Sequence, residues 1–419
     1  MIKRLLFDNL KSHLQKKEIS LIIGPRQSGK TTLMLLLKDY LLKNNKKTLF
    51  LNLDVETDRA YFTSQEKLIA KINLELGLEK SYVFIDEIQR KENAGLFLKG
   101  IYDLNLNYKF IVSGSGSLEL KEKIHESLVG RKRIFKLTTV KFIEFVNYKT
   151  SYKYENKISD FFKIEQNKSL QYLDEYLHFG GYPRVVTAET ISEKKAEMDE
   201  IYQSYIEKDI SFLLNVKNTE KVSNLIRLLA SQTGKLFNYS ECSNTINLSI
   251  ETLKKYIWYL EKTFIINRIT PFYKNIRKEI TKSPIFYFED IGFRNYALNL
   301  FNASEISDIG FLFQNFIYNI LKDVFEQSSI SINFWRTLDK AEVDFIITVG
   351  KDYIPVEVKY KSFNSAPNIS RSFRSFIIKY KPRRALVVNL NYNSLMKIDD
   401  TEVIFLPYYE LWQINNYLY

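Results

Sequence analysis

Residues 19–43, ISLIIGPRQSGKTTLMLLLKDYLLK, constrain the fold of this 419-residue chain more than any other segment. A short apolar run precedes a turn with two glycines, and apolar residues at helical spacing follow it. The turn, residues 24–31, matches the pattern G-x-x-x-x-G-K-[ST] in the strand–loop–helix context that the pattern requires. Because backbone N–H groups at a helix N-terminus bind phosphates, the segment predicts a phosphate-binding loop on a parallel α/β sheet.

The loop predicts sites for ATP and Mg²⁺. Lys30 is expected to reach the outer phosphates and to act in catalysis, and the Thr31 hydroxyl is expected to hold the magnesium ion. The residues expected to contact the nucleotide are Gly24, Pro25, Arg26, Gln27, Ser28, Gly29, Lys30, Thr31 and Thr32.

A second apolar run, SYVFIDEIQR at residues 81–90, predicts a buried parallel strand that ends in two carboxylates. Open α/β sheets bind ligands at the carboxyl ends of their strands. Asp86 is therefore expected to hold Mg²⁺ through water, and Glu87 is expected to polarise the attacking water. An acidic pair after a strand is common, and the phosphate-binding loop upstream is what makes this pair informative.

The following segments offer sensors of the nucleotide state. YKFIVSGSGSL, residues 108–118, ends in a polar cluster from which Ser113 or Ser115 would sense the γ-phosphate; a simple Ser/Gly turn is the alternative. Arg131 and Arg133 flank a final strand. A guanidinium near a subunit boundary would act as an arginine finger in trans, with Arg131 preferred, and this role requires a homo-oligomer.

The composition excludes some classes of protein. The single cysteine, Cys242, excludes an internal disulfide framework, and three scattered histidines do not have zinc-site spacing. No apolar run approaches the roughly 18 residues of a spanning helix, so we expect a cytoplasmic protein without a membrane partner. The formal charge of +12 is concentrated in residues 1–150, with 27 basic against 17 acidic residues, and in residues 220–282, with 11 against 5. This distribution favours a polyanionic partner.

The strings GPRQSGKTTL, DEIQR and LVGRKRIFKLTTVKFIEF, with the SGS turn between them, resemble a family of prokaryotic AAA+-type P-loop ATPases, and the resemblance continues through HFGGYPRVV to the carboxyl end. At the position of Thr139, members of this family usually carry a proline. The resemblance implies an α/β fold with four domains: residues 1–150 an AAA+-type ATPase core with Walker A and B motifs, 151–219 a helical lid, 220–282 a winged helix, and 283–419 a restriction-endonuclease-like α/β domain.

The middle segments have two interpretations each. In the lid, Arg184 would be a second sensor arginine, or it would simply face solvent. In the winged helix, the third helix, capped by Ser249, would offer Thr252, Lys254 and Lys255 to the DNA major groove. Winged helices also dock proteins, so a protein partner is the alternative.

The stretch AEVDFIITVGKDYIPVEVKYK, residues 341–361, predicts two strands joined by a tight turn. Asp344, Glu357 and Lys359 match the D-x₁₂-E-x-K arrangement in which nucleases of the resembled fold hold a metal and activate water. Gln314 stands where relatives of the family carry a glutamate, and it brings no charge to such a site. A solvated hairpin with an ordinary salt bridge is the alternative.

The leading functional prediction is a Mg-dependent, ATP-hydrolysing switch that engages DNA or a protein partner through its carboxyl-terminal modules. Two alternatives come from other classes. One is an ATP-gated, metal-dependent nuclease, and the other is a slow ATPase that serves in signalling or as a scaffold.

Overall fold

The computed structural model describes residues 1–115, 128–206, 219–273, 279, 282–301, 303, 306–326 and 328–418. The chain divides into two compact units. The first comprises Met1–Lys149, Gly181–Thr219 and Lys255–Ile265, and the second comprises Thr150–Gly180, Glu220–Lys254 and Ile266–Tyr419. This division cuts through the segments expected to form the lid and the winged helix, and the four-domain scheme stays a prediction.

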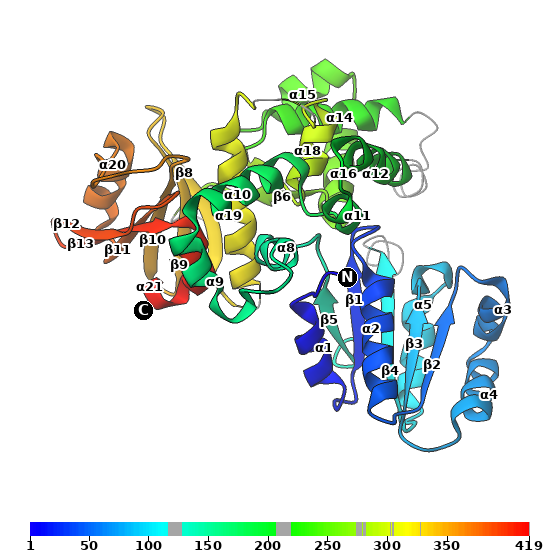
Figure 1. The fold of residues 1–419 in the computed structure, drawn as a ribbon. Coiled ribbons are helices and arrows are strands. Elements are labelled where there is room, and N and C mark those ends of the chain that lie inside the picture. The colour runs from blue at the N-terminus through cyan, green and yellow to red at the C-terminus, as the bar shows by residue number, and fades with distance from the viewer. Residues whose placement is uncertain are drawn as a thin grey trace. The chain divides into compact units, whose positions relative to one another are not determined.

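The first unit is built on a parallel five-stranded sheet in the order β2-β3-β4-β1-β5 (Figure 1). Its strands are β1 (Ile19–Gly24), β2 (Thr48–Asn52), β3 (Ser81–Asp86), β4 (Tyr108–Ser115) and β5 (Lys132–Lys136). Its helices are α1 (Leu6–His13), α2 (Lys30–Lys43), α3 (Glu56–Arg59), α4 (Gln65–Leu76), α5 (Ala94–Asp103), α8 (Phe142–Lys149), α11 (Pro183–Thr187) and α12 (Ile191–Ser204). The predicted strand, loop and helix at residues 19–43 are confirmed as β1, the turn and α2.

Helices cover both faces of this sheet because its strands are apolar on both sides. Every residue of β1, β3 and β4 is buried. One face packs against α1 and α2, through residues such as Leu10 and Leu37. The opposite face packs against α4 and α5, through residues such as Ile72 and Leu98. The result is a three-layer α/β/α arrangement of the kind that the buried apolar strands predict.

The second unit combines helices with a mixed six-stranded sheet in the order β12-β13-β11-β10-β9-β8. The sheet strands are β8 (Ser331–Arg336), β9 (Glu342–Val349), β10 (Asp352–Val358), β11 (Arg384–Asn389), β12 (Ser394–Ile398) and β13 (Thr401–Pro407). Further helices of this unit are α9 (Ile158–Ile164), α10 (Gln166–Phe179), α18 (Ile291–Ala297), α19 (Ile309–Phe325), α20 (Arg371–Tyr380) and α21 (Asn415–Leu418). The predicted hairpin at residues 341–361 is confirmed as β9 and β10, which pair antiparallel.

A smaller group of elements precedes this sheet in the sequence. It comprises α14 (Glu220–Ser231), α15 (Tyr239–Ile246), α16 (Ile250–Lys262), β6 (Ile266–Ile269) and β7 (Ile285–Phe288). Strands β6 and β7 pair antiparallel, and Leu236 forms an additional antiparallel bridge with Ile285. Ser249 caps α16 by accepting a hydrogen bond from the backbone N–H of Thr252 at 3.1 Å, as the sequence predicts.

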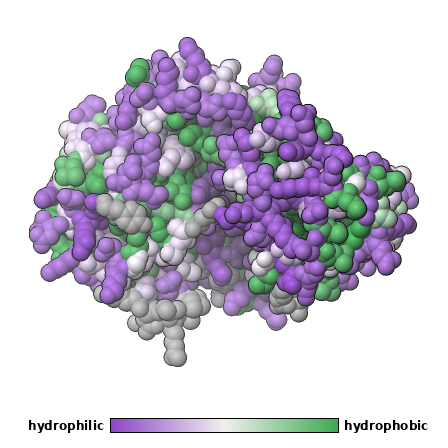
Figure 2. Space-filling model, turned by 90° about the horizontal axis from the view of Figure 1, so that it is seen from below, coloured by the Kyte–Doolittle hydropathy of each residue, from purple (hydrophilic) through white to green (hydrophobic). Residues whose placement is uncertain are grey.

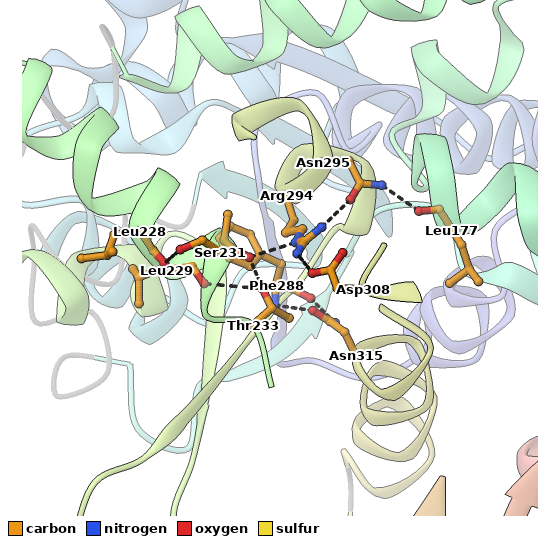
Figure 3. A network of polar contacts seen from close by, with 11 residues as sticks. Leu177, Leu228, Leu229, Ser231, Thr233, Phe288, Arg294, Asn295, Asp308 and Asn315 are labelled. Atoms are coloured by element: carbon orange, nitrogen blue, oxygen red, sulfur yellow. Dashed lines mark hydrogen bonds and ion pairs between the residues drawn. The ribbon is translucent and has the colours of Figure 1, made fainter. Parts of the chain in front are cut away.

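A buried arginine joins several segments of the second unit (Figure 3). Arg294 on α18 is only 1% exposed; its Nε donates to the Ala230 carbonyl near the end of α14 at 3.0 Å, and its guanidinium pairs with the Asp308 carboxylate. The neighbouring Asn295 donates to the Leu177 carbonyl near the end of α10 at 2.8 Å. Helix α18 is therefore held by polar contacts to three other segments.

The surface is largely hydrophilic on the face drawn in Figure 2, where hydrophobic residues lie in separate patches. Large exposed apolar side chains come from different elements, for example Leu74, Leu96, Leu338 and Ile378. Among the described helices, none combines the length and the apolar character that crossing a bilayer would need.

Candidate functional site

The strand order brings the candidate residues together at one edge of the parallel sheet. The phosphate-binding loop follows β1, Asp86 ends β3, and β4 lies between these two strands. The register pairs Ile22 with Ser113, and Ile85 with Val112. Ser113 therefore lies between the loop and Asp86, at the carboxyl ends of the strands, where open α/β sheets hold their ligands.

The backbone of the loop depends on its two glycines and on a strained glutamine. A Cβ added to Gly24 would lie 2.0 Å from the Leu137 carbonyl oxygen, so only glycine fits there. Gly29 precedes α2 with a φ of 93°, in the left-handed region that glycine adopts freely. Gln27 has a φ of 57°, which is unfavourable for a residue with a side chain.

Lys30 arches back over the loop. Its side chain is buried, and Nζ donates to the carbonyl oxygens of Gly24 at 3.1 Å and Pro25 at 2.8 Å. Two other polar atoms of the loop, Ser28 Oγ and Gln27 Oε1, are buried and have no hydrogen-bond partner in the described part of the chain. Buried polar atoms without partners are costly, so this loop is arranged to receive a polar group.

The hydroxyl groups of two elements converge on Asp86. Thr31 Oγ1 donates to Asp86 Oδ2 at 2.7 Å, and Ser113 Oγ donates to Asp86 Oδ1. Asp86 itself is only 1% exposed. A hydroxyl and a carboxylate in contact at the end of a phosphate-binding loop are oxygen ligands of the kind that Mg²⁺ prefers.

Glu87 lies beside this pair in a strained conformation. Its φ is 56°, and burial is the main cause that raises the pKa of its carboxyl group, while the positive charge of Lys30 lowers it. Its backbone N–H donates to Ser113 Oγ at 3.2 Å. A strained, partly buried carboxylate with a raised pKa is a candidate general base.

Gln89 is a candidate site residue that sequence reasoning missed. Its side-chain amide N–H donates to Glu87 Oε2, and its Oε1 accepts from the backbone N–H of Ser115 at 3.2 Å. It thus links Glu87 to the last residue of β4. The string DEIQ contains the residue, but only the turn after β3 directs its side chain back to the carboxylate.

Arg4 is a second missed residue, and it braces the loop. Its Nη1 donates to the Ser28 carbonyl at 2.8 Å, its Nε donates to the buried Glu144 carboxylate at 2.9 Å, and its Nη2 donates to the carbonyls of Thr138 and Thr139. The guanidinium therefore joins the phosphate-binding loop to the segment between β5 and α8. Arg4 lies 24 residues before Ser28 in the chain and belongs to no motif, so the sequence alone gives no signal for it.

A cavity of about 690 Å³ opens beside the loop. Arg184 lines it, with Nη1 donating to Glu200 at 2.9 Å and Nη2 donating to Glu197 at 3.0 Å. The full lining comprises Arg26, Gln27, Gly29, Lys30, Thr31, Thr32, Glu87, Pro183, Arg184, Glu200, Gln203 and Ser204. The cavity therefore brings the loop, Glu87 and the candidate sensor Arg184 together within the first unit.

Arg131 lies away from this edge. The Ile19 backbone N–H donates to the Arg131 carbonyl at 2.9 Å, which places Arg131 at the start of β1, whereas the loop follows its end. Its guanidinium forms an exposed ion pair with Asp103 at 2.7 Å. Arg133 lies within β5 and does not flank it, contrary to the expectation. Within one chain neither arginine reaches the loop, and a trans role for Arg131 stays a prediction.

The second candidate constellation lies in the second unit. Gln314 on α19 donates to Asp344 Oδ1 at 2.6 Å, and the Val358 backbone N–H donates to Asp344 Oδ2 at 2.7 Å. Burial raises the pKa of Asp344 to about 7. Glu357 on β10 is paired with Lys359 at 2.6 Å. The four predicted residues, Gln314, Asp344, Glu357 and Lys359, are thus brought into one region by α19, β9 and β10.

The first constellation fits a magnesium–nucleotide complex. It supplies the loop N–H groups, the Lys30 ammonium, the Thr31 hydroxyl and the Asp86 carboxylate at one sheet edge, beside a cavity and two buried polar atoms without partners. Among the described residues, no group of three or more His, Cys, Asp or Glu side chains is arranged for a metal ion. A cation at this site would therefore rely on phosphate and water oxygens for its other ligands.

Comparison with protein families divides the chain into three parts. Residues 16–146 match a family described as "AAA domain". Residues 170–304 match a domain of unknown function (DUF8612), and residues 309–409 match another domain of unknown function (DUF4143). The match supports the AAA-type part of the resemblance and does not test the winged helix or the nuclease-like fold.

Similar proteins occur in distant organisms. An uncharacterized protein of Haemophilus influenzae is 24% identical over 396 residues, covering 92% of this chain and 92% of the relative. The uncharacterized protein MJ1544 of Methanocaldococcus jannaschii is 25% identical over 405 residues, covering 92% of this chain and 85% of the relative. These proteins match along almost the whole chain.

Solved structures match more weakly. The replication initiator DnaA bound to AMPPCP and single-stranded DNA matches with 14% identity and a TM-score of 0.28, over 62% of this chain and 88% of that chain. Cdc6p from Pyrobaculum aerophilum matches with 9% identity and a TM-score of 0.28, over 71% of this chain and 92% of that chain. At these scores the matches carry no argument about function. From the family comparison, the chain carries an AAA domain of the P-loop type, which implies nucleotide binding, followed by two domains of unknown function.

Proposed function

We propose that the chain is a Mg-dependent ATPase in which Thr31 and Asp86 hold the metal ion, the loop and Lys30 bind the phosphates, and Glu87 polarises water. The single observation that carries the proposal is the contact of Thr31 Oγ1 with Asp86 Oδ2 at 2.7 Å, where Thr31 and the neighbouring Glu87 both line the cavity. Bound Mg²⁺ would supply charge stabilisation to the phosphates.

The residues of the chain have separable roles in this proposal. The hydrogen bonds from Lys30 to the carbonyls of Gly24 and Pro25 hold its ammonium group over the loop. To contact a phosphate, Lys30 would exchange these bonds for bonds to phosphate oxygens. The Ser113 hydroxyl donates to the Asp86 carboxylate and accepts from the Glu87 backbone N–H, so it links the side chain of Asp86 to the backbone of Glu87. Glu87, with its raised pKa, would accept a proton from water more readily than an ordinary glutamate.

The decisive experiment is the exchange Glu87→Gln, which keeps the size of the side chain and removes its charge. We expect ATP binding to persist and kcat to fall about 100-fold or more, since loss of a positioned base typically costs that factor. Glu92→Gln, the same exchange at an exposed position of the same unit, should leave kcat unchanged. Undiminished hydrolysis by Glu87→Gln would remove the enzymatic assignment of Glu87.

A contact with nucleic acid is the second candidate function, and the exposed face of α16 favours it. Lys254, Lys255 and Trp258 are exposed, whereas Tyr256 between them is buried. The order of α14, α15, α16, β6 and β7 supports the winged-helix interpretation, in which the third helix enters the major groove. An exposed aromatic ring among lysines also suits stacking on bases.

The ATPase rate with and without duplex or single-stranded DNA tests this second function. Stimulation by DNA that falls with rising salt, and that is lost in Lys254→Ala/Lys255→Ala, would support it. Lys43→Ala/Lys46→Ala is the matched control, because it removes two exposed lysines from α2 and the turn after it. If neither binding nor stimulation by DNA is found, a protein partner becomes the better hypothesis for these modules.

A further inference from the structure

The metal site that a nuclease-like fold implies in the second unit disagrees with the contacts of its residues. Gln314 comes from α19, Asp344 from β9 and Glu357 from β10, and Lys359 follows β10 directly. A group that donates to a metal-binding carboxylate must either ligate the cation itself, as the Thr31 hydroxyl beside Asp86 could, or move aside. The question is therefore what each carboxylate oxygen contacts.

Both oxygens of Asp344 already accept hydrogen bonds. Oδ1 accepts from the Gln314 side-chain amide at 2.6 Å, and Oδ2 accepts from the Val358 backbone N–H at 2.7 Å. The backbone donor cannot move without opening the end of β10. The Gln314 side chain is 6% exposed, so its amide is held against Asp344 by the surrounding protein.

Both oxygens of Glu357 also contact donors. Oε1 lies 2.6 Å from Lys359 Nζ, and Oε2 accepts from the Ser370 hydroxyl, the N-cap of α20, at 3.1 Å. The Glu357 side chain is buried, with 9% of it exposed. The two carboxylates therefore accept from four donors, of which only the Ser370 hydroxyl has an oxygen that could itself ligate a cation, although Glu357 and Lys359 also line a cavity of about 600 Å³.

The remaining polar atom of Gln314 does not complete a metal site either. Gln314 Oε1 is buried and has no hydrogen-bond partner within the described ranges, but it lies on the side of Gly234, where an added Cβ would be only 2.8 Å away. It is the Nε2 atom that faces Asp344. An amide nitrogen is a donor and cannot ligate a cation.

We propose that Gln314, Asp344, Glu357 and Lys359 form a closed polar clip that joins α19 to the β9–β10 hairpin and to α20, and that this clip does not take a divalent cation. The amide of Gln314 fills the position on Asp344 that a cation would need. The ammonium of Lys359 offsets the negative charge of Glu357, so the clip needs no metal ion to balance that carboxylate.

A single exchange of nearly equal size separates this clip from a metal site. In Gln314→Glu, a carboxylate would replace the amide against Asp344, and two carboxylates in contact without a cation repel each other. The introduced carboxylate would join Asp344 and Glu357 in offering oxygen donors to a divalent ion. We expect the variant to gain one bound Mn²⁺ per chain over the wild type, because the charge and number of the oxygen ligands set affinity.

The test is a Mn²⁺ titration of the full chain followed by electron paramagnetic resonance, carried out without nucleotide. The wild type and Asp344→Asn should bind the same amount of Mn²⁺. Any Mn²⁺ that both proteins bind is then assigned to the site of Thr31 and Asp86, because Asp344→Asn leaves that site intact. Gln314→Glu should gain one bound ion, and adding Asp344→Asn to it should abolish that gain. A melting temperature that Mn²⁺ raises more in Gln314→Glu than in the wild type, with the difference lost when Asp344→Asn is added, would support the same conclusion.

Two results would overturn the proposal. One is a wild-type chain that binds one Mn²⁺ in a manner lost in Asp344→Asn, which would make the constellation a metal site as it stands. The other is a folded Gln314→Glu variant that gains no ion. The wild-type measurement decides the first point even if Gln314→Glu fails to fold. None of these outcomes depends on ATP hydrolysis, so failure of the proposed ATPase function would be seen separately.

Discussion

The contact between Gln89 and Glu87 predicts how the pH dependence of ATP hydrolysis should respond to mutation. A hydrogen bond from an amide to a carboxylate stabilises the charged form, so the Gln89 amide opposes the burial that raises the pKa of Glu87. In Gln89→Ala this bond is absent, and the pKa of Glu87 should therefore rise further above the ordinary glutamate value.

The magnitude follows from the strength of such a bond. Hydrogen bonds to charged groups are worth about 1.5–3 kcal/mol, which corresponds to about one to two pKa units. Glu87 is only half-buried, so water replaces part of the lost interaction and the lower end applies. Since a base acts in its deprotonated form, the acid limb of the pH profile should move upward by about one unit.

The assay is kcat/KM for ATP hydrolysis measured across the acid limb in the wild type and in Gln89→Ala. Ionisation of ATP itself contributes equally to both proteins, so the difference between their limbs reports Glu87. Gln65→Ala is the matched control, because Gln65 bonds the Phe97 carbonyl and does not reach Glu87. An acid limb that stays in place in Gln89→Ala, or moves to lower pH, would refute the reasoning.

Two predictions concern the buried arginines. Arg4→Met leaves the Glu144 carboxylate buried without its cation and leaves the Ser28 carbonyl without its donor. ATP affinity should therefore fall about 10-fold or more, which is the cost of one lost hydrogen bond to a charged group. Titration with a fluorescent ATP analogue measures the affinity, and an unchanged affinity in a folded variant would contradict the bracing role. Arg294→Met leaves the Asp308 carboxylate and the Ala230 carbonyl without their donor, so the free energy of unfolding should fall by about 3–5 kcal/mol. Urea denaturation checks this, and a loss no larger than that of an exposed arginine exchange would count against it.

The sequence predicts well those parts of the site whose residues are close together in the chain. The loop at residues 24–31 is read from one segment, because the strand, the turn and the helix are all local patterns. Asp86 and Glu87 follow from a strand end in the same way. The structure confirms the strand, loop and helix that present these residues, and their proposed roles await experiment.

The missed or displaced residues depend on pairings between distant segments. Arg4 meets Ser28 and Glu144 only after β5 and α8 have packed against the loop. Arg131 lies near the start of β1 because β5 pairs parallel to β1 with Lys132 opposite Ile19. This pairing joins segments that are more than 100 residues apart, so the local sequence around Arg131 does not reveal it. Gln314 reaches Asp344 across 30 residues of sequence, and the donor that faces the carboxylate is visible only in three dimensions.

The left-handed backbone of Glu87 has a consequence for how this position tolerates change. Glycine adopts a φ near 56° without strain, whereas a residue with a side chain loses roughly 1–2 kcal/mol there. Selection for folding alone should therefore enrich glycine at position 87, and selection for hydrolysis should remove it. A library of variants scored separately for abundance and for growth would place this residue among those where the two selections point in opposite directions.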